Sequence, residues 1–179
     1  MKQQTELEII ELLNDASSVR GAVLMAVDIF ESSLEELIQR VFRKDDYAVK
    51  YAVEPLLNST GPLSNLIVRL KLLYALGIVS QDIYQDMEGL IKLKELLNHD
   101  VEEFSFTSSK TFEPIKALHA VKKMNIAQFD TPRPDKETDL MFYNMYMDRQ
   151  EQVIRSAFGL AIASICTELN QDNSLLSSK

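Results

Sequence analysis

Residues 19–42 read VRGAVLMAVDIFESSLEELIQRVF, and this stretch decides the fold class. Its apolar residues recur three and four positions apart, the spacing that places them on one face of an α-helix. They are Val19, Ala22, Val23, Ala26, Val27, Phe30, Leu34, Leu37, Ile38, Val41 and Phe42. Ser17 or Ser18 can supply the N-cap oxygen, and the charged run at 43–46 ends the helix. The stretch therefore predicts a long helix with one buried face.

A second long helix is predicted toward the C-terminus. Its apolar stripe consists of Val153, Ile154, Ala157, Phe158, Ala161, Ile162, Ile165 and Leu169. It can lie against the first long helix over several turns, because both carry a continuous apolar face. We therefore expect an all-α protein, an irregular multi-helix bundle with two long helices packed together. The length of 179 residues fits a single domain, 1–179, with 171–179 as a frayed tail.

Shorter helices are expected before and after the first long one. A short helix covers Glu6–Leu13, and another begins at Tyr47 with Asp45 or Asp46 as its cap. Pro55 disfavours helical geometry at the preceding residue, which predicts a break or kink there. The run at 58–62, Asn-Ser-Thr-Gly-Pro, predicts a turn.

The middle of the chain predicts further helices. Leu63–Leu76 is apolar on almost every side, so we expect it to be central, with Gly77 as its C-terminal cap. Ser80 begins another helix, which ends at 98–100. The stretch after it, 101–109, is expected to be irregular, with Phe104 and Phe106 filling the core. Thr111 is expected to cap a shorter helix that reaches Met124, and 125–136 to form an extended loop.

The composition indicates a cytoplasmic protein. No apolar run approaches the roughly 20 residues of a membrane span. Residues 1–6 carry acids and amides where a signal peptide has its apolar core. The single cysteine, Cys166, cannot form an internal disulfide. We expect a cytoplasmic location and no membrane contact.

The net charge of −8 opposes nucleic acid, because DNA-binding proteins usually present a basic surface to the phosphates. A helix-turn-helix reading of Leu66 onward fails on the same ground. Its second helix would begin at Ser80 with the acids Asp82, Asp86 and Glu88 and no Lys or Arg in its first turns. Direct nucleic-acid contact is not expected.

Residues able to carry chemistry are sparse. His99 and His119 are the only histidines, and a metal site needs several ligands at set spacings. Cys166 lies beside an apolar stripe, which predicts a buried thiol, and the five glycines are isolated, so there is no phosphate loop. Met141, Met145 and Met147 read either as core filler or as an adaptable partner surface. We expect no catalytic residue, no metal and no cofactor.

A second site is considered at Lys94, Asn98, His99 and Asp100. The run from Lys94 to His99 is similar to the Arg-polar-three-residue-His signature of the HEPN ribonucleases. In that family the Arg and His activate a ribose hydroxyl and steady the phosphate. Lys replaces Arg here and loses the two-pronged grip of a guanidinium. An RNA-cleaving activity is therefore kept only as an alternative.

The richest surface is the charged corner that joins the first long helix to the next. Tyr47 and Tyr51 are four residues apart and share a helix face, as do Lys50 and Glu54. The corner reads either as a solvated turn with ion pairs or as a docking surface, since Tyr and Arg are enriched at interface hot spots. The candidate partner-binding residues are Arg43, Lys44, Asp45, Asp46, Tyr47, Lys50, Tyr51 and Glu54.

The same corner carries a family resemblance. Residues 41–57, VFRKDDYAVKYAVEPLL, are followed by Gly-Pro-Leu at 61–63 and Val-Arg-Leu-Lys-Leu at 68–72, and this series closely resembles the mannitol operon repressor family. The similarity extends from Val19 to Val121, with Lys94 and Leu96 as departures where the family has Arg and Glu. The resemblance implies an all-helical regulator that lowers expression of mannitol uptake and oxidation genes, without a familiar DNA-binding motif.

These features together favour a regulator that binds another protein, either a sugar phosphotransferase component or a true DNA-binding factor. The first alternative is direct operator binding through a basic patch at Arg40, Arg43, Lys44 and Lys50. The second is the RNA-cleaving enzyme centred on His99. A homo-oligomer is compatible with all three.

Overall fold

The computed structural model describes residues 5–42, 47–58, 60–137 and 139–171. Within these ranges the chain forms eight α-helices and two 3₁₀ helices, and no β-strand. The elements in chain order are α1 (Glu6–Asn14), α2 (Val19–Val41), α3 (Tyr47–Leu57), η1 (Pro62–Ser64), α4 (Leu66–Ala75), α5 (Gln81–His99), α6 (Ser109–Ala117), α7 (His119–Met124), η2 (Ala127–Asp130) and α8 (Leu140–Asn170). The expected all-α bundle is confirmed.

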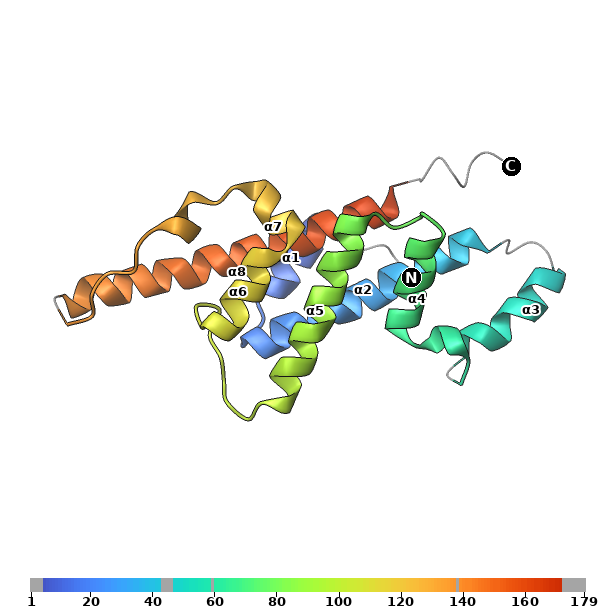
Figure 1. Ribbon diagram of the computed structural model, residues 1–179, viewed down its shortest axis with the longest axis horizontal. Coiled ribbons are helices and arrows are strands. Elements are labelled where there is room, and N and C mark those ends of the chain that lie inside the picture. Colours follow the sequence, from blue (N-terminus) through green and yellow to red (C-terminus); the bar gives the residue numbers. More distant parts are fainter. Residues whose placement is uncertain (1–4, 43–46, 59, 138, 172–179) are drawn as a thin grey trace.

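Helix α2 forms the centre of the core and contacts α5, α8 and α4 (Figure 1). Its predicted apolar face is buried from Val19 to Ile38, while Val41 and Phe42 at its end are partly exposed. Ser18 is the N-cap, and its hydroxyl oxygen accepts a hydrogen bond from the backbone N–H of Gly21 at 3.1 Å. Helix α8 packs on α2, as expected, and even more extensively along α1.

Arginine side chains close the C-termini of three helices, where backbone carbonyls have no partner inside the helix. Each guanidinium comes from a helix other than the one that it closes, so the contacts also join distant parts of the chain. The bonds to carbonyl oxygens run from Arg155 to Asn14 in α1 (2.9 Å), from Arg40 to Leu169 in α8 (3.1 Å) and from Arg20 to Asp100 after α5 (2.7 Å).

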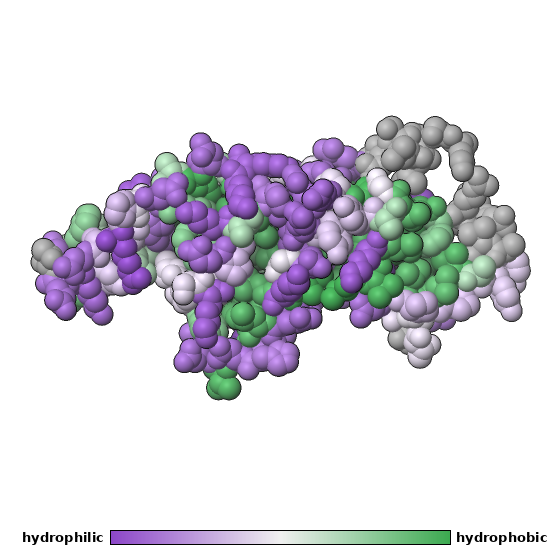
Figure 2. Space-filling view, viewed as in Figure 1, coloured by the Kyte–Doolittle hydropathy of each residue, from purple (hydrophilic) through white to green (hydrophobic). Residues whose placement is uncertain are grey.

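The prediction that the fourth helix is central is wrong. Only Arg69, Leu70 and Leu73 of α4 are buried, whereas Val68 is 42% exposed. One stripe of α4 packs against α2 and α5, and the opposite side faces outward, although it is equally apolar. Figure 2 shows this as a hydrophobic patch over α4.

The helix expected from Thr111 to Met124 is two helices. The chain begins α6 at Ser109, and Leu118 adopts extended geometry with ψ of 135°, which separates α6 from α7. Thr111 is not the cap, because it lies inside α6 and its buried hydroxyl donates to the carbonyl of Ser105 at 2.6 Å. The loop expected at 125–136 contains η2.

Other predicted boundaries are confirmed. Gly77 has a positive φ of 70°, as a helix C-terminal glycine requires, and Ser80 caps α5, which ends at His99. Phe106 is fully buried against Phe158, with ring centroids 6.0 Å apart.

The break expected before Pro55 is wrong, because α3 continues through Leu57.

By length and composition alone, α8 could cross a membrane. More than half of its most apolar window is buried inside the protein, against α1, α2 and α7. This pattern is typical of a core helix, whose apolar side chains already have protein neighbours.

Candidate partner-binding surface

Helix α3 stands at one end of the molecule, and its main contact is with η1 (Figure 1). None of its described side chains is buried. Tyr47 is 83% exposed and Tyr51 is 74% exposed, and Glu54 is exposed on the same face. Two open tyrosines beside a carboxylate are a surface that suits a protein partner.

The structure brings together three of the eight predicted corner residues. Tyr47, Tyr51 and Glu54 share a face of α3, because they lie four and three residues apart. The run from Arg43 to Asp46 and the side chain of Lys50 lie outside the described residues. The corner is therefore described on its helical side only.

The turn between α3 and η1 is closely packed, and Gly61 is the residue that permits it. A Cβ added at Gly61 would lie 2.3 Å from the carbonyl oxygen of Leu56, a distance that no real side chain tolerates. The Gly61 N–H donates to the carbonyl of Asn58 at 2.7 Å, and the Ser64 hydroxyl donates to the Gly61 carbonyl at 2.7 Å. These contacts in the predicted turn fix the position of α3 relative to η1.

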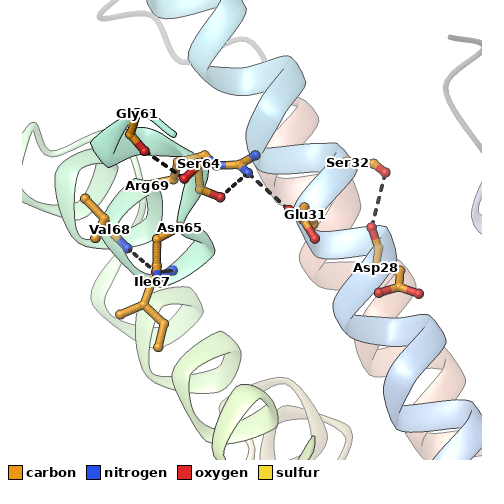
Figure 3. A network of polar contacts seen from close by, with 9 residues as sticks. All are labelled: Asp28, Glu31, Ser32, Gly61, Ser64, Asn65, Ile67, Val68 and Arg69. Atoms are coloured by element: carbon orange, nitrogen blue, oxygen red, sulfur yellow. Dashed lines mark hydrogen bonds and ion pairs between the residues drawn. The ribbon is translucent and has the colours of Figure 1, made fainter. Parts of the chain in front are cut away.

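Arg69 ties this region to the core, as Figure 3 shows. Its side chain is buried, and one nitrogen, Nη2, donates both to Glu31 Oε1 of α2 at 3.1 Å and to the carbonyl oxygen of Ser64 at 2.9 Å. The Asn65 side chain caps α4 beside it, accepting from the N–H of Ile67 at 2.9 Å. Sequence reasoning missed Arg69, although a lone Arg in an apolar helix is a detectable signal.

The outer surface of α3 and α4 is rich in exposed apolar side chains. Figure 2 shows hydrophobic residues gathered over α4, next to the end of the molecule that carries α3. The exposed members are Tyr47, Tyr51, Leu56, Val68, Tyr74 and Leu76. Gathered exposed apolar side chains often mark an interaction surface.

In the second predicted site, His99 and Asp100 bond to neighbouring parts of the chain. The ring nitrogen Nδ1 of exposed His99 bonds the carbonyl of Glu95 in its own helix at 2.7 Å. Asp100 pairs with Lys110 at 3.0 Å, and this hydrogen bond holds the pKa of the Asp100 carboxyl below its usual value. Lys94 is half-buried and Asn98 is exposed. The groups around His99 hold the end of α5 in place.

A polar cluster between α5 and α7 was not predicted. The Lys123 ammonium lies 3.0 Å from Asp82, and its hydrogen bond lowers the pKa of Asp82. The Nε2 atom of His119 bonds Gln85 Oε1 at 2.8 Å. The only signal in the sequence was that a histidine and a lysine lie four residues apart, so that they share one side of a helix.

Within the described residues no group of three or more His, Cys, Asp or Glu side chains could hold a metal ion. Cys166 is buried, and burial raises the pKa of its thiol to about 11, which keeps it protonated and unreactive. Arg40, a member of the alternative basic patch, is bonded to the end of α8, so it is not free to grip a phosphate.

Comparison with known proteins decides the family. The family model described as mannitol repressor matches residues 5–170. The mannitol operon repressor of Escherichia coli (strain K12) is 39% identical over 168 residues, covering 94% of this chain and 84% of that protein. This chain belongs to the mannitol repressor family. The resemblance seen in residues 41–57 is therefore confirmed.

Two further comparisons bear on function in the mannitol repressor family. The X-ray structure of the MtlR–HPr complex from Escherichia coli matches with a TM-score of 0.82 and 40% identity, covering 92% of this chain and 97% of that one. Fumarase E of Escherichia coli (strain K12) is 26% identical over 170 residues, covering 94% of this chain and 99% of that protein. One relative is thus crystallised with a protein partner, and a more distant one is named as an enzyme.

Proposed function

We propose that this chain represses mannitol uptake and oxidation genes by binding a protein of the sugar phosphotransferase system, and that this protein is an HPr. The observation that carries the proposal is the 0.82 TM-score, at 40% identity, to the Escherichia coli repressor in a complex with HPr. The net charge of −8 and the absence of a basic recognition helix support a mechanism through protein contact. On this proposal the chain acts in the cytoplasm.

The docking surface we propose is the charged corner with α3. Tyr47 and Tyr51 offer large aromatic faces to solvent, and Glu54 offers a charge beside them. The Gly61 turn joins this helix to η1, and Arg69 joins η1 to α2, which supports a surface that is formed before a partner binds. Arg43, Lys44, Asp45, Asp46 and Lys50 complete the proposed surface in sequence.

A mannitol-promoter reporter tests the location. Tyr51→Ala should melt near the wild-type temperature, because an exposed side chain contributes little to stability. Lys50→Ala is made beside it, and both variants are used only where they melt near the wild-type temperature. Loss of a hot-spot tyrosine should weaken partner binding by about 2 kcal/mol, roughly thirtyfold, and relieve repression. Leu96→Ala on α5, also an exposed apolar position, is the matched control.

Normal repression by stable Tyr51→Ala, Lys50→Ala and Arg43→Ala variants would show that the corner is only a turn. HPr would then dock elsewhere, and the polar cluster of α5 and α7 would be the next surface to vary. Loss of repression in Leu96→Ala as well would indicate a general effect on folding.

We also propose that the chain has no catalytic activity. The supporting geometry is the engagement of His99 with its own helix and the buried, protonated Cys166. Purified protein should neither hydrate fumarate, the activity suggested by the name of its 26% identical relative, nor cleave RNA. Turnover that survives further purification and is abolished by His99→Ala or His119→Ala would overturn this proposal.

Direct operator binding is the remaining alternative, through the basic residues of the corner. At physiological salt, purified protein should bind a mannitol-promoter duplex no better than a random duplex, because its overall field repels phosphates. Sequence-selective nanomolar binding by the protein alone would favour the alternative.

A further inference from the structure

A groove lies on the surface of α8, where α1 and α7 pack against that helix. Its volume is about 640 Å³, which falls within the roughly 300–1,000 Å³ of small-molecule sites. Helix α1 contributes Glu6 and Ile10 to the lining, and α7 contributes Met124. None of the residues of the proposed HPr surface lines it. The other lining residues belong to α8: Leu160, Ala163, Ser164, Thr167, Glu168 and Gln171.

The charge of the groove opposes an anionic ligand. The charged side chains in its lining are two carboxylates, Glu6 and Glu168, and no Lys, Arg or His of the described residues lines it. A phosphate ester or a carboxylic acid would lie against like charges without a cation to pair with. The hydrogen bond to Asp82 and, after it, the charge of Glu168 raise the pKa of Lys123, so a cation beside the groove already balances part of the charge of Glu168.

Both carboxylates already accept hydrogen bonds from hydroxyl groups. The Thr167 hydroxyl donates to Glu6 Oε1 at 2.6 Å, and the Ser80 hydroxyl donates to Glu168 Oε1 at 3.3 Å. The other oxygen, Oε2, of each carboxylate forms no hydrogen bond with the described part of the chain. The groove thus offers two acceptor oxygens whose carboxylates are held in position through their second oxygen.

Hydrogen-bond donors lie on the same helix as Glu168. Ser164 carries a hydroxyl group and Gln171 an amide, and both side chains are exposed in the groove. A ligand that binds the carboxylates and these two side chains together needs groups that donate as well as groups that accept. A hydroxyl group does both, whereas an ammonium group only donates.

We infer that this groove binds a neutral polyol, a molecule with a hydroxyl group on each carbon. From Ser164 to Gln171 the helix rises about 10 Å, which matches an extended chain of about six carbons with its terminal oxygens. Ile10, Leu160 and Ala163 form an apolar part of the lining, against which the C–H groups of such a chain pack. The inference adds a small-molecule site to the chain and does not depend on the proposed binding of HPr.

Equilibrium dialysis of the purified chain against isotopically labelled D-mannitol, a six-carbon polyol, tests the inference without any partner protein. Binding should be saturable, with one site per chain and a Kd of about 1 mM or tighter for a ligand of this size. A direct binding measurement is needed in place of a melting temperature, because sugars and related osmolytes stabilise proteins in general through exclusion from their surface.

A substitution that fills the groove tests its location. Ser164→Phe should weaken binding about tenfold or more and should melt near the wild-type temperature, because Ser164 is exposed. Ser156→Phe makes the same change at an exposed serine of α8 that does not line the groove, and it should bind D-mannitol as the wild type does. Glu168→Gln should weaken binding about tenfold, because it replaces a charged acceptor by a neutral one.

Competition tests the class of ligand. D-Sorbitol should displace labelled D-mannitol, while 1,6-diaminohexane and mannitol 1-phosphate should do so at least about tenfold more weakly. The absence of saturable binding of either polyol at about 20 mM overturns the inference. Binding that Ser164→Phe leaves intact also overturns it, as does a diamine or a phosphate ester that binds more tightly than both polyols.

Discussion

The buried carboxylate of Asp86 in α5 accepts a hydrogen bond from the backbone N–H of His119 at 2.6 Å and a second from Ala120 at 2.9 Å. These amides begin α7, whose positional N-cap, Leu118, has no side-chain oxygen to offer. A six-residue helix is too short to be stable alone. Asp86 therefore caps α7 from another helix and explains why the chain can restart a helix after Leu118.

The first prediction concerns this cap. Asp86→Ala should lower the free energy of unfolding by about 2–4 kcal/mol, because it removes two charge-assisted hydrogen bonds and leaves two amides unpaired. Asp86→Asn keeps one acceptor oxygen and should lose less. Urea unfolding followed by circular dichroism measures both. A loss below about 0.5 kcal/mol in Asp86→Ala would contradict the assigned role.

The second prediction concerns Arg69. Both of its hydrogen bonds come from the single nitrogen Nη2, while its buried Nε has no partner. A lysine can supply one nitrogen to the same two acceptors and has no Nε to leave unpaired. Arg69→Lys should therefore stay within about 1 kcal/mol of the wild type.

Arg69→Met, which keeps the apolar stem and removes the donor, should cost about 2 kcal/mol, because the Ser64 carbonyl loses its bond to Arg69. Glu31→Gln should have a smaller effect, since that carboxylate is 46% exposed. Equal losses in the Lys and Met variants would show that the shape of the guanidinium matters, and not its donor.

The third prediction is a pH dependence at the pair between α5 and α7. The hydrogen bond from Lys123 lowers the pKa of Asp82 in the folded protein. A lowered carboxyl pKa gives stability that is present above the unfolded value and is lost as the pH falls through the folded value. We therefore expect the contribution at pH 7 to begin to fall near the ordinary aspartate pKa of about 3.9 and to be lost as the pH drops through the lower folded value.

The measurement is the melting temperature of wild type and Asp82→Asn between pH 7 and pH 3. The wild type should melt higher at pH 7, and the two curves should meet at the acid end. Asp148→Asn, at an exposed acid that forms no ion pair with the described residues, is the control and should follow the wild type. A constant gap between wild type and Asp82→Asn at all pH values would mean that the effect of Asp82 is not ionic.

Local sequence patterns predicted most helices and several of their caps correctly. The stripe of α2, the Ser18 and Ser80 caps and the left-handed Gly77 depend on residues close in sequence, and the structure has all of them. Two of the errors in the helices depend on distant residues. The break at Leu118 relies on Asp86, and the open side of α4 is apolar without being covered by its own chain. Apolarity alone does not distinguish a core face from an interaction face.

The geometry of the candidate surface was predictable in part. The spacing of Tyr47 and Tyr51 correctly placed both on one exposed helix face. The contacts that hold this helix region were not predictable, because Arg69 reaches Glu31 across 38 positions of sequence. His99 was singled out by its neighbours in sequence, yet its ring binds its own helix. The corner residues Arg43–Asp46 remain predictions, since they lie outside the described residues.

The central claim is that this chain acts through a protein partner, and calorimetric titration with purified HPr tests it most directly. HPr from the same source should bind at physiological salt with a single saturable transition, one HPr per chain, and a Kd below about 10 µM. The same titration into heat-denatured protein should give no transition. Absence of binding to the folded chain at about 100 µM HPr would contradict the account.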